Sequence, residues 1–366
     1  MDFTLTKEQE LLTESLSAFL STREADDGDR WAGLADEIGV LGVALPESVG
    51  GSGGGAVEIM AVTEALGAAT ATEPFVETAV VGAGLLRYAG GPDELLRGIV
   101  DGTVRIGFAA TEAAGGHCRR DVTATARRSG DGWILDGEKT VVVGAPDATH
   151  LIVTARTSGA RRDESGISLF LVPIEGLTRP SGLRLAEYGT TDRRRAADVV
   201  FDGVEVPATA LLGDEGAAWP IVSRVMDEAT VAVSSEAVGL MRRALAETVE
   251  YTKGRRQFGQ AISDFQVIQH RLVDMYMEIE QSVSAVHLAT ASLHAEPDER
   301  ARAVSVAKAT VGRAGRFVGQ NAVQLLGGMG MVAETAVSRC FRRLTVIENE
   351  YGSTDLHIAR YADLTA

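Results

Sequence analysis

Two short segments hold the residues whose types and spacing could do chemistry. The first places Arg255 and Arg256 just before Phe258 and Gly259, between two long helical patterns. A guanidinium can bind two phosphate oxygens at once, so paired arginines beside a turn suit a diphosphate. An interhelical loop with ordinary surface arginines fits the same pattern. The residue types alone leave both interpretations open.

The second segment lies near the C-terminus, where Glu350 precedes Tyr351, Gly352 and Ser353. A carboxylate within hydrogen-bond reach of a substrate proton can remove it, and such a general base contributes about 10²–10⁴-fold to a rate. Glu350 is the candidate base of this segment. The neutral Tyr351 phenol, with an ordinary pKa of about 10, is a poor base. An exposed loop acid without a catalytic role is the alternative interpretation of Glu350.

Helices must position both segments. Apolar residues recur at helical spacing on each side of the paired arginines, and Ser263 with Asp264 can cap the second helix. The apolar residues are Val238, Leu240, Met241, Ala244, Leu245, Val249 and Tyr251 before the arginines, and Ile268, Leu272, Met275, Tyr276, Ile279 and Val283 after them. The pattern stays helical from Pro207 to the end, which predicts a helical bundle.

In residues 1–207, the spacing of the apolar residues changes once, from helical to strand-like. The first hundred residues are helical, with amphipathic patterns near 6–20 and 57–67 and a glycine-rich loop at 41–55. From Val104 to Pro207 the period is that of short strands separated by glycine-containing turns. The sequence therefore predicts a helical domain over residues 1–104, a β-barrel or sandwich over 105–207 and a helical bundle over 208–366.

The composition is that of an ordinary globular chain, with 366 residues of which 45% are hydrophobic and 23% charged. A net charge of -16 argues against nucleic acid or an anionic membrane as a partner. No apolar run reaches membrane-spanning length and residues 1–4 start no signal peptide, so a cytoplasmic location is expected. Cys118 and Cys340 are too few and too far apart in sequence for a disulfide framework or a metal site.

The arginine segment resembles a motif of the acyl-CoA dehydrogenase family. Residues 255–266 fit R-x-x-F-G-x-x-[IL]-x-x-[FH]-Q, residues 324–330 fit a second family element, and the order of segments is similar along the whole chain. The resemblance implies a mainly helical fold with a central β-barrel, and FAD as cofactor. It also implies that the diphosphate and adenine end of a neighbouring subunit's FAD is bound by Arg255, Phe258, Gln266, Gln324, Gly327 and Gly328.

The family residues that hold the flavin ring are only partly kept. Thr111 and Glu112 match the family's Thr-Glu pair, but His117 stands where the family has a serine. Three valines, 141–143, stand where the family has Trp-Ile-Thr or Trp-Ile-Ser. This exchange loses aromatic stacking and a hydroxyl hydrogen bond, about 1 kcal/mol each. The resemblance thus leaves Thr111 as a flavin contact in a degraded ring site.

The substrate side departs from the family as well. Gly352 aligns with the glycine of the family's Y-E-G-T-S segment and is expected to contact substrate, with Ser353 next to the flavin. Tyr351 falls at the glutamate position, so Glu350 could act as base only if the loop slipped by one residue. Asp227 matches a family contact to the acyl-CoA, although the arginine that usually follows it is missing.

These departures predict a subunit of an FAD-dependent acyl-CoA dehydrogenase that supports a partner's flavin without supplying the base. The partner is expected to be a paralogous subunit or a second copy in a dimer of dimers, with electron-transfer flavoprotein as acceptor. An acyl-CoA is anionic, so a chain with a net charge of -16 would repel it unless positive side chains cluster locally. Two alternatives stay open: a self-sufficient homomer with Glu350 as base, and a flavin-free scaffold or acyl-binding subunit.

Overall fold

The computed structural model describes residues 5–22, 30–116, 118–174 and 179–365. The chain folds into two compact units, each built from segments that are distant in sequence. Unit 1 combines residues 1–27, 55–71 and 227–366, and unit 2 combines residues 28–54 and 72–226. The order of helical, β and helical sections along the chain is confirmed. The boundaries of the three predicted domains stay a prediction.

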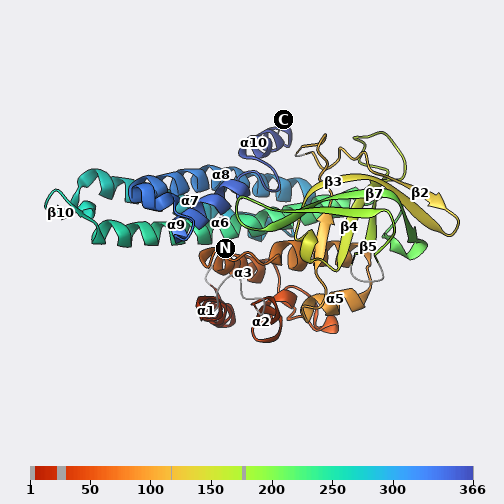
Figure 1. Ribbon diagram of the computed structural model, residues 1–366, viewed down its shortest axis with the longest axis horizontal. Helices are drawn as coiled ribbons and strands as arrows, with labels where there is room; N and C mark the ends of the chain where they lie inside the picture. Colours follow the sequence, from red (N-terminus) through yellow and green to blue (C-terminus); the bar gives the residue numbers. More distant parts are fainter. Residues whose placement is uncertain (1–4, 23–29, 117, 175–178, 366) are drawn as a thin grey trace. The chain divides into compact units, whose positions relative to one another are not determined.

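Unit 1 is a set of helices in which α7 and α8 pack side by side (Figure 1). Its members are α1 (Lys7–Thr22), α3 (Ala56–Ala68), most of α6 (Trp219–Gly254), α7 (Gln266–Ser292), α8 (Pro297–Leu326), α9 (Ala336–Ile347) and α10 (Thr354–Asp363). Buried residues recur three or four positions apart, as at Ala289 and Leu293 on α7 and at Val304 and Ala307 on α8. Each of these two helices therefore buries one apolar stripe.

Two glycines bring α3 and α6 into backbone contact. A Cβ atom at Gly239 would lie 2.0 Å from the Glu64 carbonyl oxygen, and one at Gly67 would lie 2.1 Å from that of Glu236. No larger residue fits at either position without moving the backbone. The two glycines therefore set how closely α3 crosses α6.

Unit 2 begins with short helices. They are α2 (Arg30–Asp36), the π-helical segment η3 (Val76–Gly82), α4 (Ala83–Ala89) and α5 (Asp93–Val100). The glycine-rich stretch is a compact turn rather than an open loop, because a Cβ atom at Gly51 would lie 2.2 Å from the Leu45 carbonyl oxygen. Close backbone approach therefore explains a glycine here.

The β section of unit 2 forms one eight-stranded sheet within the described residues. Its strands are β1 (Ile106–Ala109), β2 (Thr125–Ser129), β3 (Gly132–Val143), β4 (His150–Arg156), β5 (Ile167–Pro173), β6 (Leu183–Gly189), β7 (Arg195–Pro207) and β8 (Leu211–Leu212). They follow the order β6-β7-β3-β2-β4-β5-β8, with β1 paired to β4. The apolar core includes Trp133 and Phe170, whose rings meet edge to face with centroids 5.3 Å apart.

The predicted central β-barrel is not found among the described residues. The sheet ends at β6 on one side and at β8 on the other, and no pairing joins these two strands. Because β8 has only two residues, it cannot supply the ladder that closure requires. In the described part of the chain, no helix has the length and apolar character to cross a bilayer. In the same part, no group of three or more His, Cys, Asp and Glu could hold a metal ion.

Candidate functional site

The arginine segment forms a tight hairpin after α6 (Figure 1). Strands β9 (Arg256–Gln257) and β10 (Gln260–Ala261) pair across Phe258 and Gly259, whose φ angles are 55° and 85°. Positive φ at both central residues is the geometry of a type I′ turn. For a residue with a Cβ this conformation costs about 1–2 kcal/mol. The Phe258 side chain is nevertheless 92% exposed, and its ring touches that of Phe265 edge-on. An exposed aromatic ring on a strained turn indicates a contact surface.

Arg255 and Gln266 flank this hairpin, and both side chains are exposed. Within the described residues, the Arg255 guanidinium has no hydrogen bond or ion pair, so its five N–H donors are available to a ligand. The predicted capping of α7 by Ser263 and Asp264 is wrong. Phe265 is the N-cap residue and α7 has no side-chain cap, because the two polar residues lie in a preceding 3-10 turn.

Residues 324–328 end α8. Gly327 has a φ of 62°, and a Cβ atom at Gly327 or Gly328 would meet no atom within 4 Å. Gln324 is exposed beside them. The start of α7 lies next to this end of α8, because Arg271 donates to Asn321 Oδ1 at 2.5 Å. The structure thus brings the two segments that were predicted to bind FAD to the same end of unit 1.

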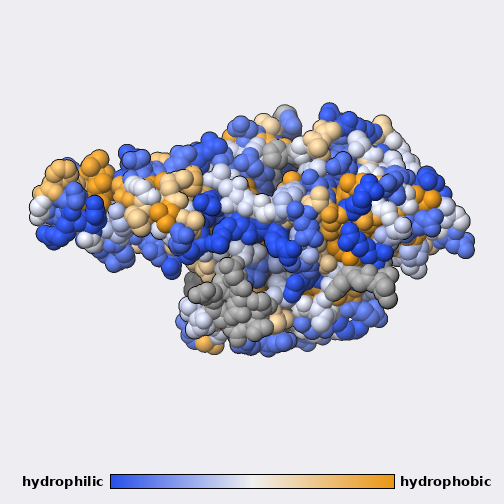
Figure 2. Space-filling model, in the orientation of Figure 1, coloured by the Kyte–Doolittle hydropathy of each residue, from blue (hydrophilic) through white to orange (hydrophobic). Residues whose placement is uncertain are grey.

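That end of unit 1 also exposes apolar side chains. Figure 2 shows hydrophobic surface around the β10 end of the bundle. Phe258, Val267, Met329 and Met331 are each at least half exposed. Grouped apolar residues on a surface mark a place where another molecule binds.

Lys308 fixes the loop that follows α9. It is fully buried on α8, and its Nζ donates to the carbonyl oxygens of Ile347, Glu348 and Gly352 at 2.8, 3.1 and 2.6 Å. These bonds use all three donors of a protonated lysine. Burial lowers the pKa of Lys308 to about 8, although the carboxylates of Glu350 and Glu348 favour its charged form. The backbone of the predicted base segment is therefore held from inside the bundle.

Glu350 is part of a buried ion-pair cluster. Its Oε2 lies 2.8 Å from Arg343 Nη1, and 13% of its side chain is exposed. Arg343 also donates to both carboxylate oxygens of Glu236, at 2.6 and 2.7 Å. One guanidinium therefore binds two carboxylates. Glu350 would have to leave this arginine before its carboxylate could reach a substrate proton.

The neighbouring backbone has an unusual shape. Tyr351 has a φ of 57° and Gly352 a φ of 115°. His357 Nε2 donates to the Tyr351 carbonyl oxygen at 3.1 Å, and burial lowers the pKa of this imidazole to about 4. A Cβ atom at Gly352 would lie 2.8 Å from the same nitrogen. Ser353 caps α10 by accepting the Leu356 N–H at 3.3 Å. The three predicted site residues of this loop, Glu350, Gly352 and Ser353, thus each make a contact within the chain.

Asp227 is also engaged within the chain. This buried carboxylate lies 2.9 Å from Arg300 Nε through one oxygen and 2.7 Å from Arg360 Nη1 through the other. The predicted contact of Asp227 with an acyl-CoA would have to compete with both arginines.

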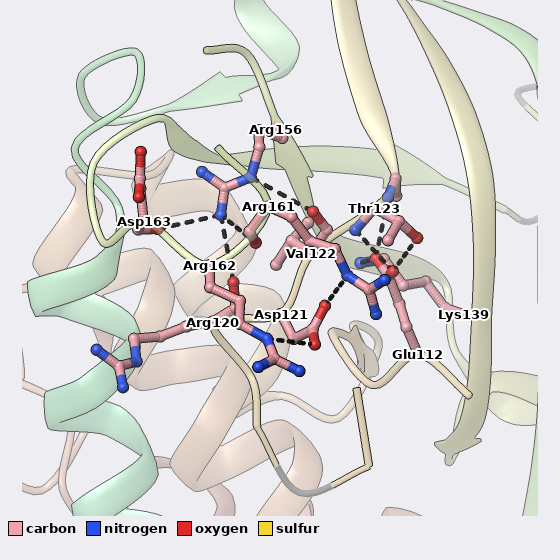
Figure 3. Close-up of polar contacts among 11 residues, drawn as sticks. Glu112, Arg120, Asp121, Val122, Thr123, Lys139, Arg156, Arg161, Arg162 and Asp163 are labelled. Carbon is pink, nitrogen blue, oxygen red and sulfur yellow. Dashed lines mark hydrogen bonds and ion pairs between the residues drawn. The ribbon is translucent and has the colours of Figure 1, made fainter. Parts of the chain in front are cut away.

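In unit 2, Glu112 ties the predicted flavin-ring segment to the sheet (Figure 3). Its carboxylate accepts from the Thr123 backbone N–H at 2.7 Å, from the Thr123 hydroxyl and from the buried Lys139 Nζ at 2.7 Å. Burial alone would raise the pKa of Glu112, but Lys139 and these hydrogen bonds outweigh it and hold the pKa below its usual range. Glu112 is therefore a structural anion. Thr111 beside it is partly exposed.

The valines at 141–143 do not form a regular strand. Val141 has a φ of 52° and lies at a bulge of β3, where its backbone N–H donates to Asp198 Oδ1 at 3.0 Å. A β-branched residue in this conformation is an outlier, with a cost of about 1–3 kcal/mol. The same Asp198 oxygen accepts the Tyr188 hydroxyl at 2.8 Å, and burial with this carboxylate raises the pKa of Tyr188 to about 12. His117 lies outside the described residues.

The chain is similar to known proteins over most of its length. The models of the acyl-CoA dehydrogenase N-terminal, middle and C-terminal domains match residues 6–95, 107–204 and 216–364. Acyl-CoA dehydrogenase FadE12 of Mycobacterium tuberculosis is 31% identical over 84% of this chain and 80% of its own length. Two solved structures each cover 99% of this chain and 98% of their own, with a TM-score of 0.86. They are a variant of the Tcur3481-Tcur3483 steroid ACAD, at 30% identity, and the ChsE4-ChsE5 complex from Mycobacterium tuberculosis, at 26% identity. The chain therefore belongs to the acyl-CoA dehydrogenase family of oxidoreductases, whose cofactor is FAD.

Proposed function

We propose that this chain is a flavin-supporting subunit of an FAD-dependent acyl-CoA dehydrogenase and does not supply the base that removes the substrate's α-proton. The observation that carries the proposal is the closed position of Glu350. Its carboxylate lies 2.8 Å from Arg343, while Tyr351 stands at the position of the family's glutamate. A general base must reach its proton directly or through one water. A carboxylate that is committed to a buried arginine does not meet this condition.

The end of unit 1 fits the diphosphate and adenine of FAD. Arg255 offers unbonded N–H donors, Phe258 offers an exposed flat ring, and Gly328 leaves its backbone open to close approach. Gln324 is exposed in the same region. Outward-facing groups of this kind suit a flavin that is bound mainly by a neighbouring subunit. These residues would hold the diphosphate and adenine of FAD, and the bound cofactor would supply a hydride acceptor for the oxidation of the acyl chain.

The chain's own flavin-ring site offers fewer contacts to a flavin than the family's site does. Val141 and the valines after it supply neither an aromatic ring nor a hydroxyl. Thr111 remains a proposed contact to the flavin, as does Ser353. Gly352 and Asp227 remain proposed contacts to the acyl-CoA, although the Gly352 carbonyl is already bonded to Lys308. The contrast between a weakened ring site and an open diphosphate surface favours a supporting role.

The partner would be a paralogous acyl-CoA dehydrogenase subunit, or a second copy of this chain, in a dimer of dimers. The exposed apolar side chains beside the hairpin support an interface there. The similarity to the ChsE4-ChsE5 complex supports a heteromer. Electron-transfer flavoprotein would reoxidise the flavin, as the family resemblance implies.

Purifying the chain alone and together with its native partner tests the proposal. We expect a colourless chain that becomes yellow only in the assembly, as measured by flavin absorbance after gel filtration. A yellow, active homomer would instead identify a self-sufficient dehydrogenase. A chain that takes up no flavin in either state would identify a scaffold or acyl-binding subunit.

A further inference from the structure

Unit 2 contains a pocket of about 640 Å³ beside the edge strand β6. In the described part of the chain, none of the predicted site residues lines it. The lining comes from residues 102–105 before β1, from the turn between β3 and β4, from Ile174 after β5, and from Arg179, Leu185 and Glu187 before and within β6. Pockets of about 300–1,000 Å³ hold small-molecule ligands. This pocket is therefore large enough for one.

The pocket lies at the open end of the sheet's apolar core. Ala148 and Ile174 are buried members of that core, and Leu185 packs against it. Because side chains alternate along a strand, Glu187 lies on the same face of β6 as Leu185. The pocket therefore combines apolar walls with polar side chains at the edge where the described sheet does not close into a barrel.

The pocket is separate from the predicted flavin-ring segment. Tyr188 follows Glu187 on β6 and so points to the opposite face. Its hydroxyl donates to Asp198 Oδ1 at 2.8 Å, and the same oxygen accepts the Val141 N–H at 3.0 Å. A ligand in the pocket would therefore lie on the other side of the sheet from Val141.

Two arginines of the pocket have no counter-ion among the described residues. Arg105 is half-buried, and its guanidinium lies over the Trp31 ring, 5.2 Å from the centroid, without a hydrogen bond or ion pair. Arg179 is exposed, and its guanidinium donates to the Leu183 carbonyl oxygen at 3.2 Å without an ion pair. Each guanidinium has five N–H donors, so both have donors left for a ligand.

The two acidic side chains of the lining are already paired. Arg195 donates to Asp147 Oδ1 and, at 3.0 Å, to Glu187 Oε2. With Arg105 and Arg179, three arginines stand against two carboxylates at this pocket. The pocket is therefore locally positive in a chain whose net charge is -16.

We propose that this pocket binds a free organic acid with an apolar body. Arg105 and Arg179 would hold the carboxylate, because a guanidinium donates two parallel N–H groups to carboxylate oxygens. Ala148, Ile174 and Leu185 would contact the apolar body. Inorganic phosphate would match the charges but leave these apolar walls unfilled, so the lining favours an amphipathic acid. The inference does not rest on the proposed function, because it concerns a separate pocket.

Calorimetric titration of the full chain with octanoate, 1-octanol and inorganic phosphate tests the proposal. Octanoate has both the carboxylate and the apolar chain, whereas 1-octanol has only the chain and phosphate only the charge. We expect octanoate to bind at least about ten-fold more tightly than either of the others, because it alone uses the arginines and the apolar walls together.

The double variant Arg105→Gln/Arg179→Gln should bind octanoate about ten- to hundred-fold more weakly, because charge-assisted hydrogen bonds are lost. Arg184→Gln is the matched control, because Arg184 is an exposed arginine on the opposite face of β6 and pairs with Asp202. It removes one positive charge and should leave the affinity unchanged. Arg179→Gln alone should also weaken octanoate binding. It keeps the test decisive if loss of the contact between Arg105 and Trp31 unfolds the chain.

Leu185→Trp narrows the pocket without changing its charge. It should weaken the binding of octanoate and 1-octanol together, whereas the arginine variants should weaken that of octanoate alone. Absence of octanoate binding, or binding of 1-octanol or phosphate as tight as that of octanoate, would overturn the proposal. Octanoate affinity that the arginine variants leave unchanged would place the ligand elsewhere and overturn it as well. Each of these outcomes leaves the flavin test of the proposed function untouched.

Discussion

Replacing Glu350 by glutamine separates a structural carboxylate from a catalytic one. The substitution keeps the size of the side chain and one acceptor for Arg343, which retains its bonds to Glu236 at 2.6 and 2.7 Å. It exchanges an ion pair between two charged groups for a contact in which only the Arg343 guanidinium is charged, and Arg343 keeps Glu236 as its counter-ion. We therefore expect the fold to survive and the activity of the assembled enzyme to stay within a few-fold of the wild type.

The assay is acyl-CoA-dependent reduction of an electron acceptor, with flavin content measured on the same sample. Glu348→Gln is the matched control, because Glu348 lies in the same loop and pairs with Arg316 Nε at 3.1 Å. Loss of a true general base costs about 10²–10⁴-fold. A loss of that size in Glu350→Gln alone, with flavin still bound, would refute the reasoning. The chain would then be an enzyme with its own base.

Three further predictions address other parts of the structure. Arg255→Ala should weaken flavin retention about ten- to hundred-fold by loss of a charged phosphate contact. Arg243→Ala is the control, because Arg243 is an exposed arginine of α6 with an i,i+4 ion pair, and it should not change flavin retention. Dialysis against free flavin compares the two variants. Because the pKa of His357 falls from 6.5 to about 4 on folding, the unfolded chain binds an extra proton between these values. Stability should therefore drop by up to about 1.4 kcal/mol per pH unit as the pH falls through this window. Urea unfolding of the wild type and His357→Gln at about pH 7.5 and 5.5 measures this drop, and equal pH dependence of the two proteins would contradict it. Gly239→Ala should lower the stability of the fold by about 1–3 kcal/mol, because its Cβ would meet the α3 backbone. Gly254→Ala is the control, since a Cβ atom there has open space and should not lower the stability. Thermal melts of the two variants measure the difference.

The parts of the fold that could be predicted are those with strong local patterns. The helices around the paired arginines carry long apolar stripes, and α6 and α7 are found there. Strand β6 escaped prediction because only Leu183 among its seven residues is buried, so the alternation of apolar and polar residues is weak. Strand β8, with two residues, is too short to leave a pattern. The prediction of a β-barrel was wrong for the same reason, because closure of the sheet depends on its edge strands, β6 and β8, and the sequence hardly marks either.

The outward-facing part of the candidate site was visible in the sequence, whereas its internal supports were not. Arg255 and Phe258 lie in one short motif, so spacing alone singles them out. Arg343 and Glu236 are 107 positions apart, and only the fold brings them together. The sequence did indicate that Lys308 is buried, because this charged residue follows the buried Val304 by four positions on α8, within the apolar stripe. A charge at a core position indicates a buried polar task but does not identify its partners.

The same internal contacts decide which residue of the loop can act as base. Glu350 could take the place of Tyr351 only if the loop slipped by one residue, whereas Lys308 donates to the loop backbone in its present register at 2.8, 3.1 and 2.6 Å. The slip would also move Tyr351 into the position of Gly352, where φ is 115° and a Cβ atom would lie 2.8 Å from His357 Nε2. Only glycine tolerates that position without strain. The packing of the loop therefore opposes the register that a catalytic Glu350 needs, which supports the proposal that a partner supplies the base.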